Sequence, residues 1–417
     1  MALLATAVIL VAQATRMPAL SDPTGVTLPS NWALHTPTLT ALLAPLTTLW
    51  DGVSMLSRSR LSGFLLGLGL IYLGWRTIVR LRRPVAVMAA VGREAVVAMS
   101  TLAWFVAFVA VGLAWNTRPS VRLAGLHADD LTVEVHAHTN ASHDVRSWPV
   151  AEFDAAASLA WHRRAGVDLV FITDHNTTRG WNLALAGSQR GESWLCPGVE
   201  VSAHGAHVVV LGQPLPADSA GYRGGPERRA ALFREIAAAP QAVAIASLPE
   251  YRGQVAEFIA EGVHGFEIVN ASPKGNAFPR TERDSVIAAA RRHGLALVGT
   301  GDQHGYGATP MAWNVMRLPG WRMRSDPPCA TIVAALRSGG PDAVRIVERA
   351  RVRVDSPLPL FLTPVGVLWV AWATMSPGSV LAWLVWIWGG AMARRSVLEF
   401  LRRRRTAAIM TTVAQFR

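Results

Sequence analysis

Cysteine and lysine are scarce in this 417-residue sequence, and each scarcity limits the possible functions. The two cysteines, Cys196 and Cys329, have no zinc-ligand spacing and form no disulfide framework, so they do not indicate a redox compartment. A single lysine, Lys274, leaves arginine to supply almost all of the positive charge behind the net charge of +12. Such a chain could bind nucleic acid. Many of the arginines lie beside long apolar segments, however, which favours contact with the lipid bilayer over nucleic acid.

Charged side chains are missing from long stretches near both ends of the chain. Residues 95–115 and 358–393 contain none, and residues 61–79 contain only one. Because about 20 apolar residues are enough to cross a membrane, we expect two transmembrane helices within residues 61–116. Met375-Ser-Pro-Gly interrupts the C-terminal stretch, so we expect a transmembrane hairpin over residues 358–393, or one kinked helix. The alternative is that these segments are core helices of a large soluble protein.

The remaining terminal segments are expected to flank these spans. Residues 1–60 would form an N-terminal apolar segment and an interfacial region, and residues 394–417 a basic tail. The first 14 residues could be a signal peptide, although they lack a basic n-region. Arginines between the first two spans favour a cytoplasmic loop and an external middle domain, whereas a C-terminal hairpin before a cytoplasmic tail would place that domain inside. The sequence therefore predicts a multi-pass protein of the cell membrane and leaves the side of its middle domain open.

Residues 121–354 have the pattern of a folded domain, and eleven of the twelve histidines lie between His127 and His304. Short apolar runs alternate with helical stretches, which is typical of βα units and a mostly parallel sheet. Seven or eight strands fit a closed or distorted barrel at least as well as an open sheet. The expected strands are 131–135, 167–172, 199–202, 207–211, 242–245, 265–269, 296–298 and 313–318, and the expected helices are 150–164, 226–239, 251–261 and 281–293.

Four clusters of histidine and carboxylate residues follow expected strands, where α/β barrels and doubly wound sheets carry their active sites. In the first cluster, His136 and His138 would point to the same face of a strand, because side chains alternate along it. Taken alone, such a pair often occurs by chance, and the other clusters could be capped turns. The other three are Asp174 with His175, Glu200 with His204 and His207, and Asp302 with His304. Together, at successive strand ends, the four predict a metal-dependent hydrolase.

The order H-x-H, T-D-H, G-x-E…H and D-x-H resembles the polymerase and histidinol phosphatase (PHP) superfamily of metal-dependent phosphoesterases. The resemblance covers residues 131–320. It implies an α/β fold, a distorted (β/α)7 barrel, here flanked by N- and C-terminal transmembrane helices. It also implies two or three divalent metal ions at the C-terminal ends of the strands. Mixed imidazole and carboxylate ligands suit Zn, Mn or Fe better than Mg or Ca.

The resemblance also implies a set of metal ligands: His136, His138, His143, His175, Glu200, His207, Asp302 and His304. Glu200 would bridge the ion of the first histidine pair to a second ion at His207, and His143 would belong to a third. Leu248 stands where members of the superfamily have a further histidine before a proline. His204, Glu250 or water could replace that ligand, or the site could hold fewer ions.

We expect a membrane-anchored hydrolase in which a metal-bound hydroxide attacks a small-molecule phosphoester or ester. Asp174 would orient His175 or transfer a proton, and Glu200 would hold the ions. Lys274 and Arg280 could bind an anionic substrate, unless their loop is simply solvated. A carbamate or ester hydrolase of the same superfamily and a non-catalytic membrane sensor with a degenerate metal barrel remain alternatives. A transporter is disfavoured, because the expected spans contain no acidic residue.

Overall fold

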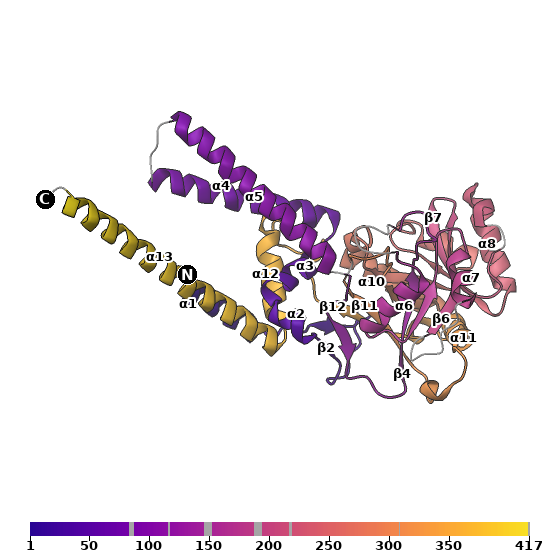
Figure 1. The fold of residues 1–417 in the computed structure, drawn as a ribbon. Helices are drawn as coiled ribbons and strands as arrows, with labels where there is room; N and C mark the ends of the chain where they lie inside the picture. Colours follow the sequence, from indigo (N-terminus) through magenta and orange to yellow (C-terminus); the bar gives the residue numbers. More distant parts are fainter. Residues whose placement is uncertain are drawn as a thin grey trace.

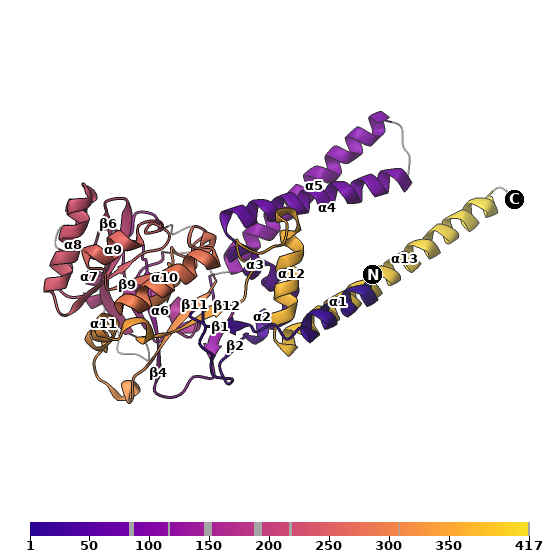
Figure 2. The same cartoon turned by 180° about the vertical axis from the view of Figure 1, so that it is seen from behind.

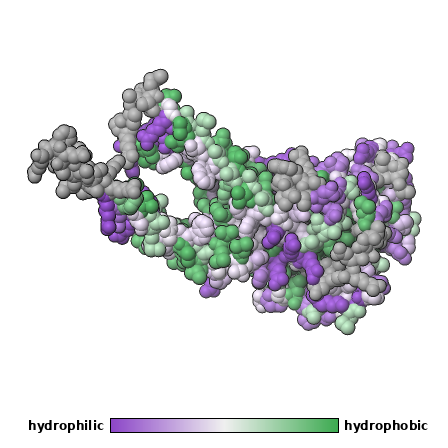
Figure 3. Space-filling view, in the orientation of Figure 1, coloured by the Kyte–Doolittle hydropathy of each residue, from purple (hydrophilic) through white to green (hydrophobic). Residues whose placement is uncertain are grey.

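The computed structural model describes residues 1–82, 87–115, 117–145, 152–186, 194–216, 219–307 and 309–415. These residues form an α/β domain and a group of helices that project from one side of it (Figure 1, and from behind in Figure 2). Hydrophobic side chains gather over the projecting helices and hydrophilic ones over the α/β domain (Figure 3). The surfaces of the two parts therefore differ in polarity.

The secondary-structure elements follow one another along the chain with these bounds. The helices are α1 (Ala2–Ala14), α2 (Thr38–Leu42), α3 (Ala44–Ser54), α4 (Arg58–Arg82), α5 (Val87–Trp115), α6 (Ala155–Arg164), α7 (Arg179–Ala186), α8 (Pro226–Ala238), α9 (Val255–Glu261), α10 (Arg280–His293), α11 (Cys329–Ser338), α12 (Thr363–Thr374) and α13 (Pro377–Gln415). Short 3-10 helices are η1 (Ser219–Arg223), η2 (Gly275–Ala277), η3 (Trp321–Met323), η4 (Gly340–Asp342) and η5 (Leu360–Leu362). The strands are β1 (Leu20–Ser21), β2 (Ala33–His35), β3 (Arg122–Ala124), β4 (Asp130–Ala137), β5 (Leu169–Ile172), β6 (Trp194–Ala203), β7 (Ala206–Gly212), β8 (Ala242–Ala246), β9 (Gly265–Asn270), β10 (Ala296–Thr300), β11 (Ala312–Arg317) and β12 (Arg345–Arg349).

The helices α4 and α5 cover the two N-terminal apolar segments and form a hairpin. Among the described residues, Arg58–Arg82 and Val91–Trp115 are the two helical segments long and apolar enough to cross a membrane. An ion pair between Arg76 of α4 and Glu94 of α5 joins the two helices. Arg76 therefore has an acidic partner on the neighbouring helix.

The C-terminal apolar segment differs from the expected hairpin of two crossings. Its first arm, α12, has 12 residues, and at 1.5 Å per residue it is about 18 Å long, well short of the roughly 30 Å hydrocarbon core of a bilayer. The second arm, α13, has 39 residues. The side chains of α1 reach both arms, because Trp388 Nε1 of α13 donates to Thr6 Oγ1 at 3.2 Å and Gln13 Nε2 donates to the Trp372 carbonyl of α12. Only α13 is long enough for a crossing in this region.

One curled sheet of ten strands forms the α/β domain, in the order β1-β12-β11-β4-β5-β6-β7-β8-β9-β10. All eight strands expected from the sequence are present. The expected mostly parallel barrel is not, because the pairings β1–β12, β12–β11, β11–β4, β6–β7 and β7–β8 are antiparallel. A turn of two residues, His204-Gly205, joins β6 to β7 and leaves no room for the crossover that a parallel pair needs.

The curl of the sheet brings β10 next to β4. Asn314 of β11 joins the two strands, because its Nδ2 donates to the carbonyls of Val133 at 3.0 Å and Gly299 at 2.7 Å. At the end of β4, the His138 amide donates to the Gln303 carbonyl at 3.0 Å. The carboxyl ends of β4, β5, β6 and β10 consequently surround one space.

Residues that precede α4 complete the domain. Leu20 and Ser21 in β1 pair with β12, and β2 pairs with β3 in a separate two-stranded sheet. These strands have only two or three residues, too few to show an alternating pattern in the sequence. The N-terminal segment therefore contributes to the domain as well as to the expected interfacial region.

A disulfide joins Cys196 of β6 to Cys329 at the start of α11, with 5.7 Å between their Cα atoms. The sequence interpretation that these residues form no disulfide is wrong. The two cysteines are 133 residues apart in sequence, and only the fold brings α11 against β6.

Candidate metal centre

The first part of the candidate site is a pair of histidines, His136 and His138, at the C-terminal end of β4. All eight residues of β4 are buried, and a register irregularity lies between Glu134 and Ala137. His136 and His138 point into the same space, with their Nε2 atoms 3.0 Å apart. Both side chains are fully buried, so they reach the site from inside the domain.

Glu200 of β6 and Asp302, just after β10, face this pair. Glu200 Oε2 lies 3.1 Å from His136 Nε2 and 3.3 Å from His138 Nε2. Asp302 Oδ1 lies 3.5 Å and 3.3 Å from the same two nitrogens. Neither oxygen has a hydrogen-bond partner among the described residues, although both are buried. Ligands about 2.1 Å from one tetrahedral ion are about 3.4 Å apart, so His136, His138 and Asp302 are spaced to hold a divalent cation, with Glu200 beside the two imidazoles.

The backbone at Asp302 is unusual in a way that serves this geometry. Its φ is +43°, a left-handed conformation that few residues other than glycine, asparagine and aspartate adopt. The Gly301 amide donates to Glu134 Oε2 at 2.9 Å, and the His136 amide donates to Glu134 Oε1 at 3.0 Å. Glu134 thus holds β4 and the Asp302 turn together, and its burial raises the pKa of its carboxyl to about 8.

Glu200 also reaches a second group of ligands through its other oxygen. Its Oε1 lies 3.2 Å from His207 Nδ1, and its Oε2 lies 3.0 Å from His175 Nδ1. Burial alone would raise the pKa of the Glu200 carboxyl, but the charge of His136 and the close contacts with the imidazoles of His138 and His207 hold this pKa well below its usual value. One oxygen of Glu200 thus faces His136, His138 and His175 and the other faces His207, an arrangement suited to bridging two cations.

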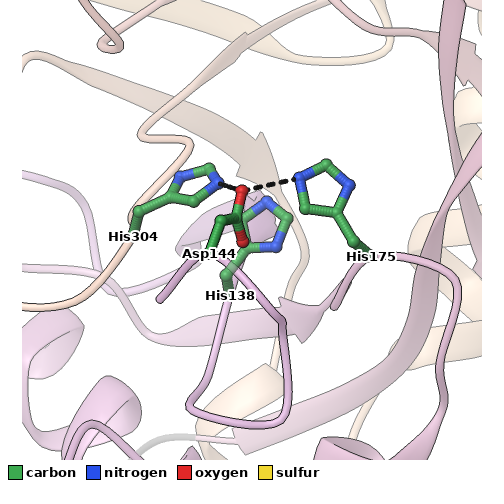
Figure 4. A group of neighbouring side chains, drawn as sticks. All are labelled: His138, Asp144, His175 and His304. Atoms are coloured by element: carbon green, nitrogen blue, oxygen red, sulfur yellow. Dashed lines mark ion pairs between the residues drawn. The ribbon is translucent and has the colours of Figure 1, made fainter. Parts of the chain in front are cut away.

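The third group centres on Asp144, which the sequence analysis did not single out. Asp144 Oδ2 lies 3.1 Å from His175 Nε2 and 3.0 Å from His304 Nε2, with His138 behind them (Figure 4). His143, the residue predicted for this position, has its ring centroid 5.3 Å from that of His175 and belongs to none of the three clusters. Among the described residues of the loop after β4, Asp144 and not His143 therefore contacts both His175 and His304.

The pKa values in this third group reflect close ion pairing. Burial alone would lower the pKa of His304, but the hydrogen bond to Asp144 and the charge of Asp302 outweigh it and raise the pKa to about 9. Burial alone would raise the pKa of Asp144, yet its bonds to His175 and His304 hold it well below the usual range. Asp144 therefore forms close ion pairs with His175 and His304.

A further carboxylate, Glu267 in the middle of β9, fixes His136. Glu267 Oε1 accepts a hydrogen bond from His136 Nδ1 at 2.6 Å, which leaves Nε2 free to bind a cation. Its Oε2 accepts from the Leu248 amide at 2.8 Å and from Asn270 Nδ2 at 3.0 Å. The Leu248 side chain is buried in the core, so this residue supports the site through its backbone and supplies no ligand. Glu267 stands alone in an apolar run, and no sequence pattern revealed it.

The remaining predicted residues lie around these groups. Asp174 accepts hydrogen bonds from the amide of Thr139 at 2.6 Å and from its hydroxyl at 2.8 Å, and it holds the turn after β4 rather than the ring of His175. Lys274 Nζ lies 4.0 Å from Glu250 Oε1, and the charge of Glu250 acts on His207. Arg280 is exposed at the start of α10 and donates its amide to Asp355.

His204 does not replace the missing histidine ligand. Its Nδ1 donates to the Gly224 carbonyl at 2.8 Å, which turns the ring toward η1. Glu250 is half-buried near His207, and burial raises the pKa of its carboxyl. Glu250 is therefore the better placed of the two residues to contribute to the second group.

No protein-family model and no curated protein matches this sequence. Similar solved structures include an amidohydrolase from Chromobacterium violaceum, with 17% identity and a TM-score of 0.31 over 45% of this chain and 92% of that one. PsfC from Pseudomonas syringae has 16% identity and a TM-score of 0.37 over 58% of this chain and 96% of that one. A two-domain protein from Bacteroides vulgatus that contains a predicted PHP-like metal-dependent phosphoesterase has 18% identity and a TM-score of 0.33, over 45% of this chain and 59% of that one.

Proposed function

We propose that this protein is a membrane-anchored metal-dependent hydrolase of phosphoesters. The observation that carries the proposal is the position of Glu200, whose two carboxylate oxygens face different imidazoles. The three groups of possible ligands share His138, His175 or Glu200 with a neighbouring group. A continuous set of this kind favours two or three ions in contact with one substrate over isolated structural ions.

Net charge favours an anionic reacting group in this site. Three carboxylates, Asp144, Glu200 and Asp302, contribute three negative charges. Glu267 beside His136 adds a fourth negative charge. Two divalent ions with four positive charges would make the site neutral, and three ions with six would give it a net charge of +2, which favours an anionic reacting group when three ions are bound. Bound ions would acidify a water molecule and neutralise charge that develops on phosphoryl oxygens. The protein's own part is to orient the ligands, and Glu267 and Glu134 do this from within the domain.

The test uses the full chain purified in detergent. We expect bound Zn, Mn or Fe and hydrolysis of phosphomonoesters or phosphodiesters. Glu200→Ala should lower kcat/KM by at least about a hundredfold, because it removes a ligand shared by two groups. The control is Glu227→Ala, which removes an exposed glutamate on α8 and should leave activity unchanged. Hydrolysis that survives Glu200→Ala would contradict the proposal, and activity on carboxylic or carbamate esters alone would favour the other substrate class.

We further propose that α4, α5 and α13 cross a bilayer. Large apolar side chains on these helices are exposed, among them Leu66 at 56%, Trp104 at 78% and Val385 at 61%. The pairing of β2 with β3 requires residues 33–35 and 122–124 to lie on the same side of that bilayer. The α4–α5 hairpin between them must then cross an even number of times, which agrees with two crossings.

The domain would lie on the external side in this arrangement. Arg80 lies in the last turn of α4, and Arg395 follows the apolar first half of α13. Both helices run away from the domain (Figure 1). Arginines concentrate on the cytoplasmic side of membrane proteins. The Cys196–Cys329 disulfide also favours an oxidising compartment for the domain. The arginines between α4 and α5 and those of the C-terminal tail would then lie on the same, cytoplasmic side. This holds because α12 is too short to cross, so the C-terminal segment crosses only once.

A further inference from the structure

The edge of the sheet that carries the metal centre faces the helical part of the protein. Because β12 is antiparallel to β11 and β11 is antiparallel to β4, the carboxyl ends of β12 and β4 lie on the same edge. Arg349, at the end of β12, forms an ion pair with Asp51 of α3, with 2.9 Å between Nη2 and Oδ2. At the same edge, η2 contacts α4. The rim of the candidate site is therefore attached to helices that precede and include the membrane hairpin.

The loop that carries Asp302 and His304 is part of this attachment. Thr309, a few residues further along, donates its hydroxyl to Asp51 and accepts a hydrogen bond from Arg349 Nη1 at 3.1 Å. A Cβ atom on Gly307 would lie 3.7 Å from Leu113 Cδ2 on α5. Asp51 and Thr309 are both buried. The same loop thus carries two candidate ligands and contacts both α3 and α5.

Asp51 also lines a cavity of about 720 Å³. Its walls come from α3, the end of β12, the N-terminal segment and α12, and they include Met55, Val367, Val370 and Ala371. Asp51 and Arg349 line it as a mutually neutralised pair. The volume is typical of sites for small ligands, and the apolar wall suits a hydrocarbon chain.

We infer that the substrate is an amphiphile from the bilayer, whose ester group reaches the metal centre from the helical side while its apolar chain occupies this cavity. This inference rests on the proposed hydrolase function. It follows from Asp51, which lines the cavity and also accepts a hydrogen bond from Thr309 in the loop after His304. A soluble phosphoester would make no use of this arrangement.

The test compares two substrates with one headgroup, hexadecyl phosphate in phosphatidylcholine vesicles and butyl phosphate in solution. The full chain, reconstituted in the same vesicles, should hydrolyse hexadecyl phosphate with a kcat/KM at least about tenfold higher, because the cavity holds the long chain and butyl phosphate has no chain long enough to fill it. Ala371→Trp, which fills the cavity, should remove this preference by raising the KM for hexadecyl phosphate. The variant should keep the metal content and the circular dichroism spectrum of the wild type, which reports that it is folded.

The matched control is Leu381→Trp on α13, where the side chain is 63% exposed and outside the cavity. It should keep the wild-type preference for the long chain. Equal kcat/KM values for the two phosphates in the wild type would overturn the inference and leave the proposed hydrolase intact. A retained preference in a folded Ala371→Trp protein would overturn the cavity as the site of the chain. Hydrolysis of neither phosphate would overturn both proposals.

Discussion

His162 of α6 is a buried histidine outside the metal centre. Its Nδ1 donates to the Ser158 carbonyl at 2.8 Å, and its Nε2 has no hydrogen-bond partner among the described residues. Burial, opposed only by the bond to Ser158, lowers the pKa of its imidazole from 6.5 to about 4. Protonation would place an unpaired charge in the core, so the folded domain keeps this ring neutral.

The lowered pKa predicts a dependence of stability on pH. Between pH 6.5 and pH 4 the unfolded chain binds a proton at His162 that the folded chain does not, so stability falls as the pH falls through this window. The loss is about 3 kcal/mol from this residue. Denaturant unfolding of the metal-free protein at several pH values measures this fall in the free energy of unfolding. In His162→Phe the fall between pH 6.5 and pH 4 should be smaller by about 3 kcal/mol.

The control for that measurement is His127→Phe, whose side chain is 56% exposed in the wild type. Because exposed groups gain little from folding, this variant should keep the wild-type pH dependence. An unchanged pH profile in His162→Phe would contradict the lowered pKa of His162.

At the scale of elements, the loop after β4 decides which carboxylate enters the third group. Asp144→Asn should lower the affinity for one ion by about 10- to 100-fold, because it removes the oxygen shared by His175 and His304. His143→Asn, the matched change at the neighbouring position, should leave the metal content unchanged. Metal analysis of the two purified variants after dialysis checks both expectations. Loss of an ion in the His143 variant alone would restore the ligand predicted from the sequence.

Strands and loops differ in how far their sequences predict their structure. The eight expected strands were found because each contains a buried apolar run, as in Ala242–Ala246. The strand β12 was missed because its apolar pair lies between charged residues, and Glu348 is held by contacts with Arg283, Arg351 and Arg353 that only the fold creates. In the loop after β4 no periodicity applies, so adjacent residues such as His143 and Asp144 could not be distinguished. Strand direction also depends on connections that the periodicity does not contain.

The candidate site was predictable to a similar extent. Residues within strands, such as His136 and Glu200, could be expected to point into the site because their position along the strand sets the direction of the side chain. Glu267 and Asp144 were missed because a buried carboxylate in an apolar run and a residue in a loop give no periodic signal. The disulfide was missed because Cys196 and Cys329 are separated by most of the domain.

At the scale of the whole molecule, the proposed orientation predicts which positions are reachable from outside the cell. Arg234→Cys, on the exposed face of α8, should react with a membrane-impermeant maleimide in intact cells. Arg395→Cys, whose side chain is 83% exposed on α13, should react only after the membrane is permeabilised. The reverse pattern would place the domain in the cytoplasm and contradict the orientation, while reaction of both positions in intact cells would contradict a crossing by α13.

The pairing of β1 with β12 bears on the order of events during synthesis. Leu20 and Ser21 leave the ribosome early, whereas their partners Arg349 and Glu348 follow only after the rest of the sheet has been made. Until then the outer edge of β11 lacks its neighbour and presents unpaired backbone groups. Contacts between such distant parts of a chain form slowly. A chain that ends before residue 345 would therefore expose an unpaired edge strand, which is prone to aggregation and to proteolysis.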